Sequence, residues 1–270
     1  MKKILLLGSI IILSALVVSC GAPSTPTPAP TAPPAQANNT NDVKGLQIFT
    51  EEFPPVNFSK DGKATGLGTE VVEEILKRQG LDVTIQVVPW ARGYRAAQDG
   101  PMTVLFVATR TEQREKLFKW VGPVVTQTTS FYALKDSNIT LTSLDDAKKI
   151  DIIGVVADYY SQQYLTKEGF ANLDISTDND PMIRKLLAGR LPLIVSENIS
   201  LPALLAISGA KLEDVRLVYT FMTSQNYIAF SLDTPDELVQ QWQASLDEMK
   251  ADGAFAQIYE KWLPGSVPPP

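Results

Sequence analysis

The segment TVLFVATRTEQREKLFKWVGP, residues 103–123, joins an apolar run directly to a polar one. Its first six residues are apolar or β-branched, which predicts a buried strand over residues 103–108. The next six residues are all polar, and Thr109, Arg110, Thr111 and Arg114 are among them. We expect them at the carboxyl end of the strand, where ligands bind in open α/β sheets, with Thr111 capping a short helical turn.

An arginine beside a helix start suits an anionic ligand. The unpaired backbone N–H groups of the first turn and the guanidinium both favour a carboxylate. We therefore expect at least one of Arg110 and Arg114 to contact a ligand. The alternative is that both are solvated surface charges, as most arginines are.

The composition excludes several classes of function. Of the 270 residues, 44% are hydrophobic and 20% charged, which is ordinary for a globular protein. There is no His and a single Cys, Cys20, which excludes His-based catalysis, disulfides within the chain and Cys-rich zinc sites. The net charge is −6, and no basic stripe is available to neutralise phosphates. We expect no nucleic-acid partner, no cofactor and no metal.

Residues 1–20 have the pattern of a secretory signal. Lys2 and Lys3 precede an apolar run over residues 4–18, which is short for a membrane span. The run ends in VVSCG, residues 17–21, which resembles a lipoprotein signal whose Cys becomes the acylated N-terminus. We favour lipidation at Cys20 over a cleaved signal with an incidental Cys. The mature protein would then be extracytoplasmic and lipid-anchored to the cell membrane without spanning it.

Residues 21–44 read as a linker. The tract APSTPTPAPTAPPAQA at residues 22–37 cannot form a packed core and favours polyproline II, at about 3.1 Å per residue. This length predicts a spacer of roughly 50 Å that holds the folded part off the membrane.

From residue 45 the chain alternates between strand and helix patterns, which predicts an α/β fold with mostly parallel sheets. Two such α/β series, joined by two extended segments, predict two lobes with a cleft between them. The expected strands are residues 46–50, 82–88, 103–108, 124–134, 151–156, 192–196, 215–219 and 227–231. The expected helices are residues 69–79, 90–98, 160–168, 181–188 and 201–207. A further helix begins at a cap formed by Ser143, and another runs from a capping box at Thr234 to about residue 251. A last helical turn carries Tyr259 and Trp262.

Three segments resemble the family 3 extracellular solute-binding proteins, the polar amino acid receptors of ABC importers. They are EEFPPVNF at 51–58, VVPWARGYRAAQDG at 87–100 and TRTEQREKLFKWVGP at 109–123, and the resemblance covers residues 45–263. It implies a two-lobed, periplasmic-binding-protein-like (type II) fold with crossover segments near residues 130–133 and 228–230. The first lobe would comprise residues 45–130 and the returning segment 229–265, and the second lobe residues 131–228.

The resemblance also implies roles for individual residues. The family's arginine that grips the α-carboxylate of the solute falls on Arg114, and the contacts just before it fall on Ala108 and Thr109. The family's Gly-Thr or Gly-Ser loop in the second lobe is replaced here by ADYY at residues 157–160, which puts the usual carboxylate contacts from that lobe in doubt. The family's Asp for the α-amino group matches Glu197 imperfectly, and capping or pairing at the next helix start is an equally good role for Glu197.

Aromatic residues gather at positions that face the expected cleft: Phe53, Trp90, Phe106, Tyr132, Tyr159 and Tyr160. Core packing is the stronger expectation for Trp90 and Phe106, whereas Tyr159 and Tyr160 lie in a loop where ligand contact is as good an interpretation.

We predict a monomeric, membrane-tethered receptor that captures a small zwitterionic or carboxylate-bearing solute and delivers it to an ABC permease, and not an enzyme. The candidate ligand contacts are Arg114, Arg110, Thr109, Ala108, Glu52, Phe53, Trp90, Phe106, Tyr132, Tyr159, Tyr160 and Glu197. One alternative is an extracytoplasmic enzyme such as a dehydratase, with Glu51, Glu52 and Glu197 as acid and base. The other is a ligand sensor for a signalling partner.

Overall fold

The computed structural model describes residues 43–270 of the chain. Cys20, the signal sequence and most of the linker lie outside the described residues. Within residues 43–270, no helix combines the length and the apolar character that crossing a membrane requires.

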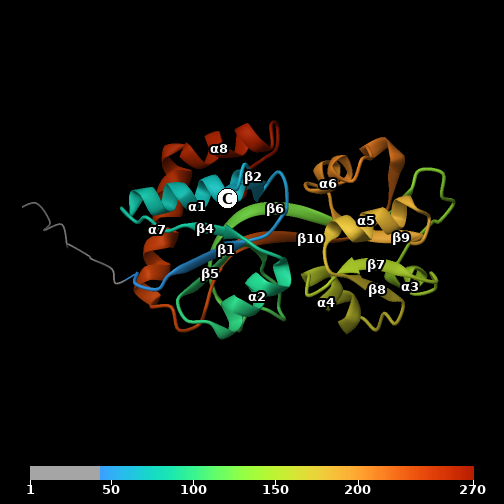
Figure 1. Ribbon diagram of the computed structural model, residues 1–270, viewed down its shortest axis with the longest axis horizontal. Helices are drawn as coiled ribbons and strands as arrows, with labels where there is room; N and C mark the ends of the chain where they lie inside the picture. Colours follow the sequence, from blue (N-terminus) through green and yellow to red (C-terminus); the bar gives the residue numbers. More distant parts are fainter. Residues whose placement is uncertain (1–42) are drawn as a thin grey trace, which may run out of the picture. The chain divides into compact units, whose positions relative to one another are not determined.

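One mixed sheet carries the described part, with the strand order β4-β1-β5-β10-β6-β9-β7-β8. At its centre, β6 (Lys119–Leu134) and β10 (Val215–Phe230) run antiparallel to each other. β10 also pairs with β5 of the first lobe, and β6 pairs with β9 of the second. These two long strands therefore connect two α/β lobes, as Figure 1 shows.

The first lobe is built on three parallel strands, β1 (Gln47–Thr50), β4 (Ile85–Val87) and β5 (Thr103–Thr109). Its helices are α1 (Leu67–Arg78), α2 (Trp90–Asp99), α7 (Asp236–Asp252) and α8 (Ala254–Trp262), and a hairpin of β2 (Phe58–Lys60) and β3 (Lys63–Thr65) lies beside them. The C-terminal helices α7 and α8, red in Figure 1, pack against α1, so the end of the chain returns to the first lobe.

The second lobe repeats the arrangement with β7 (Ile153–Val156), β8 (Leu173–Ser176) and β9 (Leu193–Glu197), again parallel. Its helices are α3 (Leu144–Ala147), α4 (Tyr160–Lys167), α5 (Asn179–Leu187) and α6 (Leu201–Ile207), and the short 3-10 helix η1 (Leu212–Asp214) leads into β10. Ser143 caps α3 as expected, because its side chain accepts from the backbone N–H of Asp146.

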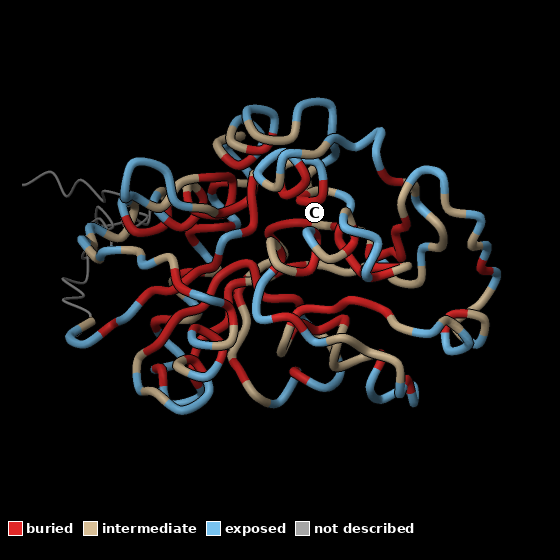
Figure 2. Tube along the Cα trace, turned by 45° about the vertical axis from the view of Figure 1, so that its right-hand side comes forward, coloured by how far each residue is buried: buried red, intermediate tan, exposed pale blue. Residues whose placement is uncertain are grey.

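The helices pack on the sheet through apolar side chains that recur along one face of each helix. On α1, Val71, Val72 and Ile75 are completely buried, and each such side chain contributes roughly 1.5–3 kcal/mol through burial. On α7, Trp242 is completely buried and meets Phe230 of β10 edge-on at 5.1 Å. Figure 2 shows the same pattern along the chain, with buried strands inside and exposed loops at the periphery.

The predicted two-lobed α/β fold is confirmed, and several local predictions are wrong. No helix follows Thr111: residues 112–117 form successive turns, because the chain must enter β6 at Lys119 soon after β5 ends. The expected strands 215–219 and 227–231 belong to the single strand β10. The capping box at Thr234 does not form, since the buried Thr234 hydroxyl bonds with Ser231 and α7 has no side-chain cap. The β2–β3 hairpin and β8 were not predicted.

Candidate functional site

A small cavity lies where the two lobes meet at the long strands. Its volume of about 20 Å³ has room for one or two water molecules, since one needs roughly 10–15 Å³. Its lining comes from the first lobe, both long strands and the second lobe: Glu51, Phe53, Trp90, Val107, Thr109, Arg114, Gln127, Asn226, Tyr159, Tyr160 and Glu197.

An irregularity at the end of β5 shapes one wall. Val107 has φ +61°, which is strained for a β-branched residue, and the pairing of β5 with β10 shifts at this point. The Val107 side chain lies over Gly68 at the start of α1, where an added Cβ would be 2.6 Å from Val107 Cγ2. Beyond the bulge, Thr109 Oγ1 donates to Asn226 Oδ1 at 2.6 Å and joins β5 to β10 at the cavity.

Arg114 is the cation of the cavity, and only 1% of it is exposed. Its Nη1 donates to the carbonyl of Thr109 at 3.4 Å, within the first lobe. Its Nε donates to Gln163 Oε1 at 3.0 Å and its Nη2 to the carbonyl of Asp158 at 2.8 Å, both in the second lobe. All three acceptors are neutral oxygens. Burial lowers the pKa of Arg114 from its ordinary value, against the opposing influence of nearby Tyr and Glu side chains.

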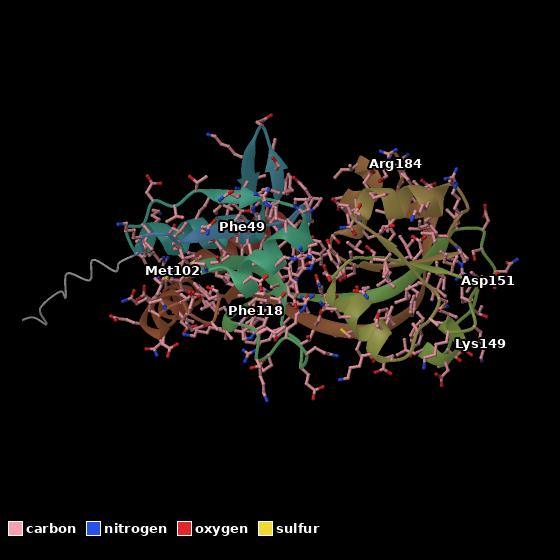
Figure 3. The ribbon with its side chains drawn as sticks, turned by 60° about the horizontal axis from the view of Figure 1, so that its bottom comes forward. Phe49, Met102, Phe118, Lys149, Asp151 and Arg184 are labelled. Atoms are coloured by element: carbon pink, nitrogen blue, oxygen red, sulfur yellow. The ribbon has the colours of Figure 1, made fainter. Side chains whose placement is uncertain are left out.

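Aromatic rings hold the guanidinium in place. Its central carbon lies 5.2 Å from the ring centre of Trp90 and 4.8 Å from that of Tyr94. Trp90 and Tyr94 stack at 5.5 Å, and Phe118, labelled in Figure 3, meets Tyr94 edge-on at 5.6 Å. Cation–π attraction of this kind strengthens when water is excluded, so the rings fix the orientation of Arg114.

The backbone carbonyl of Asp158 is one point where the lobes contact each other. It accepts hydrogen bonds from Trp90 Nε1 at 2.8 Å, Arg114 Nη2 at 2.8 Å and Gln163 Nε2 at 3.3 Å. Asp158 has φ +59°, a left-handed conformation that Asp tolerates better than most residues. The ADYY loop thus directs a carbonyl oxygen at the guanidinium.

Two buried carboxyl groups face the same cavity from opposite lobes. Glu51 accepts a hydrogen bond from the hydroxyl of Tyr159, and burial raises the pKa of Glu51 to about 8. Glu197 is 2% exposed, and burial raises its pKa to about 7, although the Tyr160 hydroxyl opposes the shift. Its Oε1 is buried and has no hydrogen-bond partner among residues 43–270.

Seven of the twelve candidate residues line this cavity: Phe53, Trp90, Thr109, Arg114, Tyr159, Tyr160 and Glu197. Phe106, Ala108 and Tyr132 are buried in the apolar cores instead. Glu52 is exposed, and its carboxylate accepts from the backbone N–H of Ser59 at 3.1 Å. Arg110 pairs with Glu115 at 2.6 Å and lies against Trp120 and Tyr227, outside the cavity.

The sequence reasoning did not place four lining residues among the ligand contacts: Glu51, Val107, Gln127 and Asn226. For Gln127 a signal existed, because it is a polar residue inside the predicted strand 124–134, whereas Asn226 lies between the expected strands 215–219 and 227–231 and nothing marked it. Glu51 is adjacent to Glu52, and no pattern separates the two. Nothing in the sequence marks the positive φ of Val107.

The comparisons with known proteins define the class of protein. Residues 46–265 match the bacterial extracellular solute-binding proteins, family 3, and the chain belongs to this family. It is similar to a probable histidine-binding protein of Campylobacter jejuni, with 22% identity over 97% of this chain and 99% of the relative. It also resembles the L-cystine-binding protein TcyA of Bacillus subtilis, with 24% identity over 97% and 98% of the two chains. These relatives are binding proteins, not enzymes.

Among solved structures, an ancestral arginine-binding protein bound to arginine superposes with a TM-score of 0.71 and 25% identity, over 82% of this chain and 99% of the other. The family match and this superposition confirm the periplasmic-binding-protein fold.

Proposed function

We propose that the protein captures a small solute bearing both a carboxylate and an ammonium group, and delivers it to an ABC permease. One observation carries this proposal: Arg114 and Glu197 are buried in the same cavity, and neither forms a direct ion pair with another residue in the described part of the chain. A zwitterion supplies the two missing partners at once.

Arg114 would hold the carboxylate. A planar guanidinium forms two parallel charge-assisted bonds with a carboxylate, which are about twice as strong as bonds to neutral acceptors. In this structure the carbonyl of Asp158 accepts from Nη2. A solute carboxylate would replace it, and the aromatic rings of Trp90 and Tyr94 would keep the guanidinium oriented.

Glu197 would hold the ammonium group. A buried carboxyl oxygen without a donor is costly, and an ammonium group donating to it removes that cost. Thr109, Gln127 and Asn226 offer further polar contacts, while Phe53, Trp90, Tyr159 and Tyr160 exclude water. We leave Arg110 and Glu52 out of the proposed contacts because both lie outside the cavity.

The proposed attachment to the membrane depends on Cys20 and the linker, and Cys20 and most of the linker lie outside the described residues. Acylation at Cys20 and the Pro-rich linker would tether the receptor near its permease, and the receptor would act as a monomer. We also propose the lobe limits 45–130, 131–228 and 229–265, since the long strands cross near these positions.

Calorimetry on the purified full chain with a panel of amino acids tests the proposal. Once a ligand is found, Arg114→Ala should weaken binding by roughly two to four orders of magnitude, because a buried charge loses its partner. Arg114→Lys should recover only part of the affinity that Arg114→Ala loses, because lysine lacks the planar guanidinium that binds a carboxylate with two hydrogen bonds. Arg110→Ala is the matched control and should bind within threefold of wild type. If Arg110→Ala abolishes binding and Arg114→Ala does not, the assignment of the anchor is wrong.

A further inference from the structure

We propose that the rings of Tyr159 and Tyr160 fill the space that a solute side chain would need, so that the preferred ligand is a short, uncharged amino acid such as glycine, alanine or serine. This inference rests on the proposed function and deepens it by naming the substrate class. It assigns a specificity role to two neighbouring side chains of the second lobe.

The two anchors of the solute restrict where its side chain can point. With the carboxylate on Arg114 and the ammonium group on Glu197, the third substituent of the solute Cα has to face the remaining walls of the cavity. These walls are formed by Glu51, Phe53, Trp90, Val107 and Thr109 of the first lobe, Gln127 and Asn226 of the long strands, and the two tyrosines.

The cavity volume makes the return of each wall decisive. At about 20 Å³ the cavity cannot hold an amino acid, so the two lobes have to separate before the ligand enters. The space around a bound solute then depends on which side chains come back to their places when the lobes close again. A ring that its own lobe holds in place comes back, and it limits the length of the solute.

Tyr159 closes the side of the cavity between Glu51 and Trp90. Its hydroxyl donates to Oε2 of Glu51, and its ring meets that of Trp90 edge-on with ring centres 5.8 Å apart. Those two partners belong to the first lobe. Within the second lobe, Asn179 Nδ2 donates to the same hydroxyl at 3.0 Å, and the backbone N–H of Gln163 donates to the Tyr159 carbonyl at 3.0 Å. The bonds to Asn179 and Gln163 do not depend on closure, so the second lobe carries this ring into the cavity.

Tyr160 fills the side of the cavity next to β6. Its ring is buried, and its hydroxyl bonds with Thr129 Oγ1 and accepts from Gln127 Nε2 at 3.2 Å. Thr129 is the partner of Glu197 in the register of β6 and β9, so Tyr160 is fixed beside the proposed ammonium site. A long side chain directed this way would have to displace a hydrogen-bonded, buried ring.

The charges of the cavity favour an uncharged substituent. The zwitterion itself supplies partners for Arg114 and Glu197. Glu51 accepts from Tyr159, and burial raises the pKa of Glu51 to about 8, so this carboxyl is mostly protonated near neutral pH and needs no positive partner. A third charge on the solute would be buried without a counter-charge, which is costly.

Calorimetry on the purified full chain, with short and long amino acids compared, tests the inference. The tightest ligand among glycine, alanine and serine should bind wild type at least about 100-fold more tightly than leucine or arginine does, because each methylene group without space costs about tenfold or more. Binding is measured on the intact protein in solution, where the lobes can separate.

Tyr159→Ala removes one ring and should make the site accept longer solutes. Leucine or arginine should bind this variant at least about tenfold more tightly than it binds wild type. Tyr164→Ala is the matched control. It removes a ring of the same size from the same helix, but Tyr164 stacks on Phe221 and does not line the cavity, so the variant should keep the wild-type preference.

The possible failures can be told apart. If leucine or arginine binds wild type as tightly as the short amino acids do, with both dependent on Arg114, the rings give way to the ligand; the inference is then wrong and the proposed function stands. If Tyr159→Ala gains no affinity for the longer amino acids, the role of Tyr159 is equally wrong. If no amino acid binds wild type at all, the proposed function fails and the inference with it. The wild-type comparison decides the matter even if Tyr159→Ala does not fold.

Discussion

Arg114 and Asp158 belong to different lobes, and Nη2 of the Arg114 guanidinium donates to the backbone carbonyl of Asp158 at 2.8 Å. The same carbonyl accepts from Trp90 Nε1, and Gln163 of the second lobe accepts from Arg114 Nε. The lobes thus hold each other through the group that we propose as the ligand anchor. Because this closed arrangement has no room for an amino acid, it competes with ligand binding.

Gln163 is a suitable residue for testing that competition. Gln163→Ala removes an acceptor of Arg114 and a donor to the Asp158 carbonyl, so the closed arrangement should lose population. Small-angle scattering should give a larger radius of gyration for the ligand-free variant than for ligand-free wild type, and ligand should reduce both to a common value. Identical radii for the two ligand-free proteins would show that these bonds do not control closure.

Gly68→Ala tests the packing that supports the strained bulge of β5. The new Cβ would lie 2.6 Å from Cγ2 of Val107, whose branched side chain has little freedom to move. We expect a loss of about 1–3 kcal/mol in the free energy of unfolding. Thermal unfolding should show a decrease of roughly 2–10 °C. The double variant Gly68→Ala/Val107→Ala should recover part of the loss, and no recovery would mean that the clash lies elsewhere.

Much of this fold could be predicted because its helices and strands are locally periodic. The helix at residues 201–207 has the predicted bounds, and the buried strand at 103–108 extends by one residue to Thr109. The prediction of two strands within β10 was wrong because Thr223, Ser224 and Gln225 interrupt the apolar pattern. These polar residues remain in the strand because β6 pairs with them there, and pairing depends on a segment distant in sequence.

The candidate site could be predicted only in part, for a similar reason. Arg114 and Glu197 are far apart in sequence, and the structure brings them to one cavity. The choice between Glu51 and Glu52 depends on which way the chain turns after β1 ends at Thr50. A shift of one residue reverses the face that a side chain points to, and no local pattern fixes this shift. The bond from Tyr159, a residue of the other lobe, shows which carboxyl is inside.

Cys20→Ser tests the membrane anchor, whose residues lie outside those described. Wild type expressed with its own leader should be recovered with the membrane fraction and carry lipid at Cys20. The variant lacks the sulfur atom that receives the lipid, so it should be released or remain unprocessed. Cell fractionation measures how much protein is recovered with the membrane, and mass spectrometry shows whether the precursor is processed and lipidated. Unchanged behaviour of the variant would contradict the lipoprotein prediction.

The two buried carboxyls predict how stability depends on pH. Burial raises the pKa of Glu51 from its ordinary 4.5 to about 8 and that of Glu197 to about 7. Between pH 4.5 and these values the folded protein keeps protons that the unfolded chain releases, so the free energy of unfolding falls as pH rises. The slope reaches at most about 1.4 kcal/mol per pH unit for each group. Any opening of the lobes would hydrate both carboxyls and limit the total loss.

Without ligand, the melting temperature should therefore be several degrees higher at pH 5.5 than at pH 8.5. Glu51→Gln removes one of the two groups, so its melting temperature should change less over the same range. Glu52→Gln, whose carboxylate is exposed, should retain the wild-type dependence. Scanning calorimetry at matched ionic strength measures all three proteins. A wild-type melting temperature that stays level or increases from pH 5.5 to 8.5 would show that Glu51 and Glu197 are hydrated in solution and that the ligand-free lobes stand open.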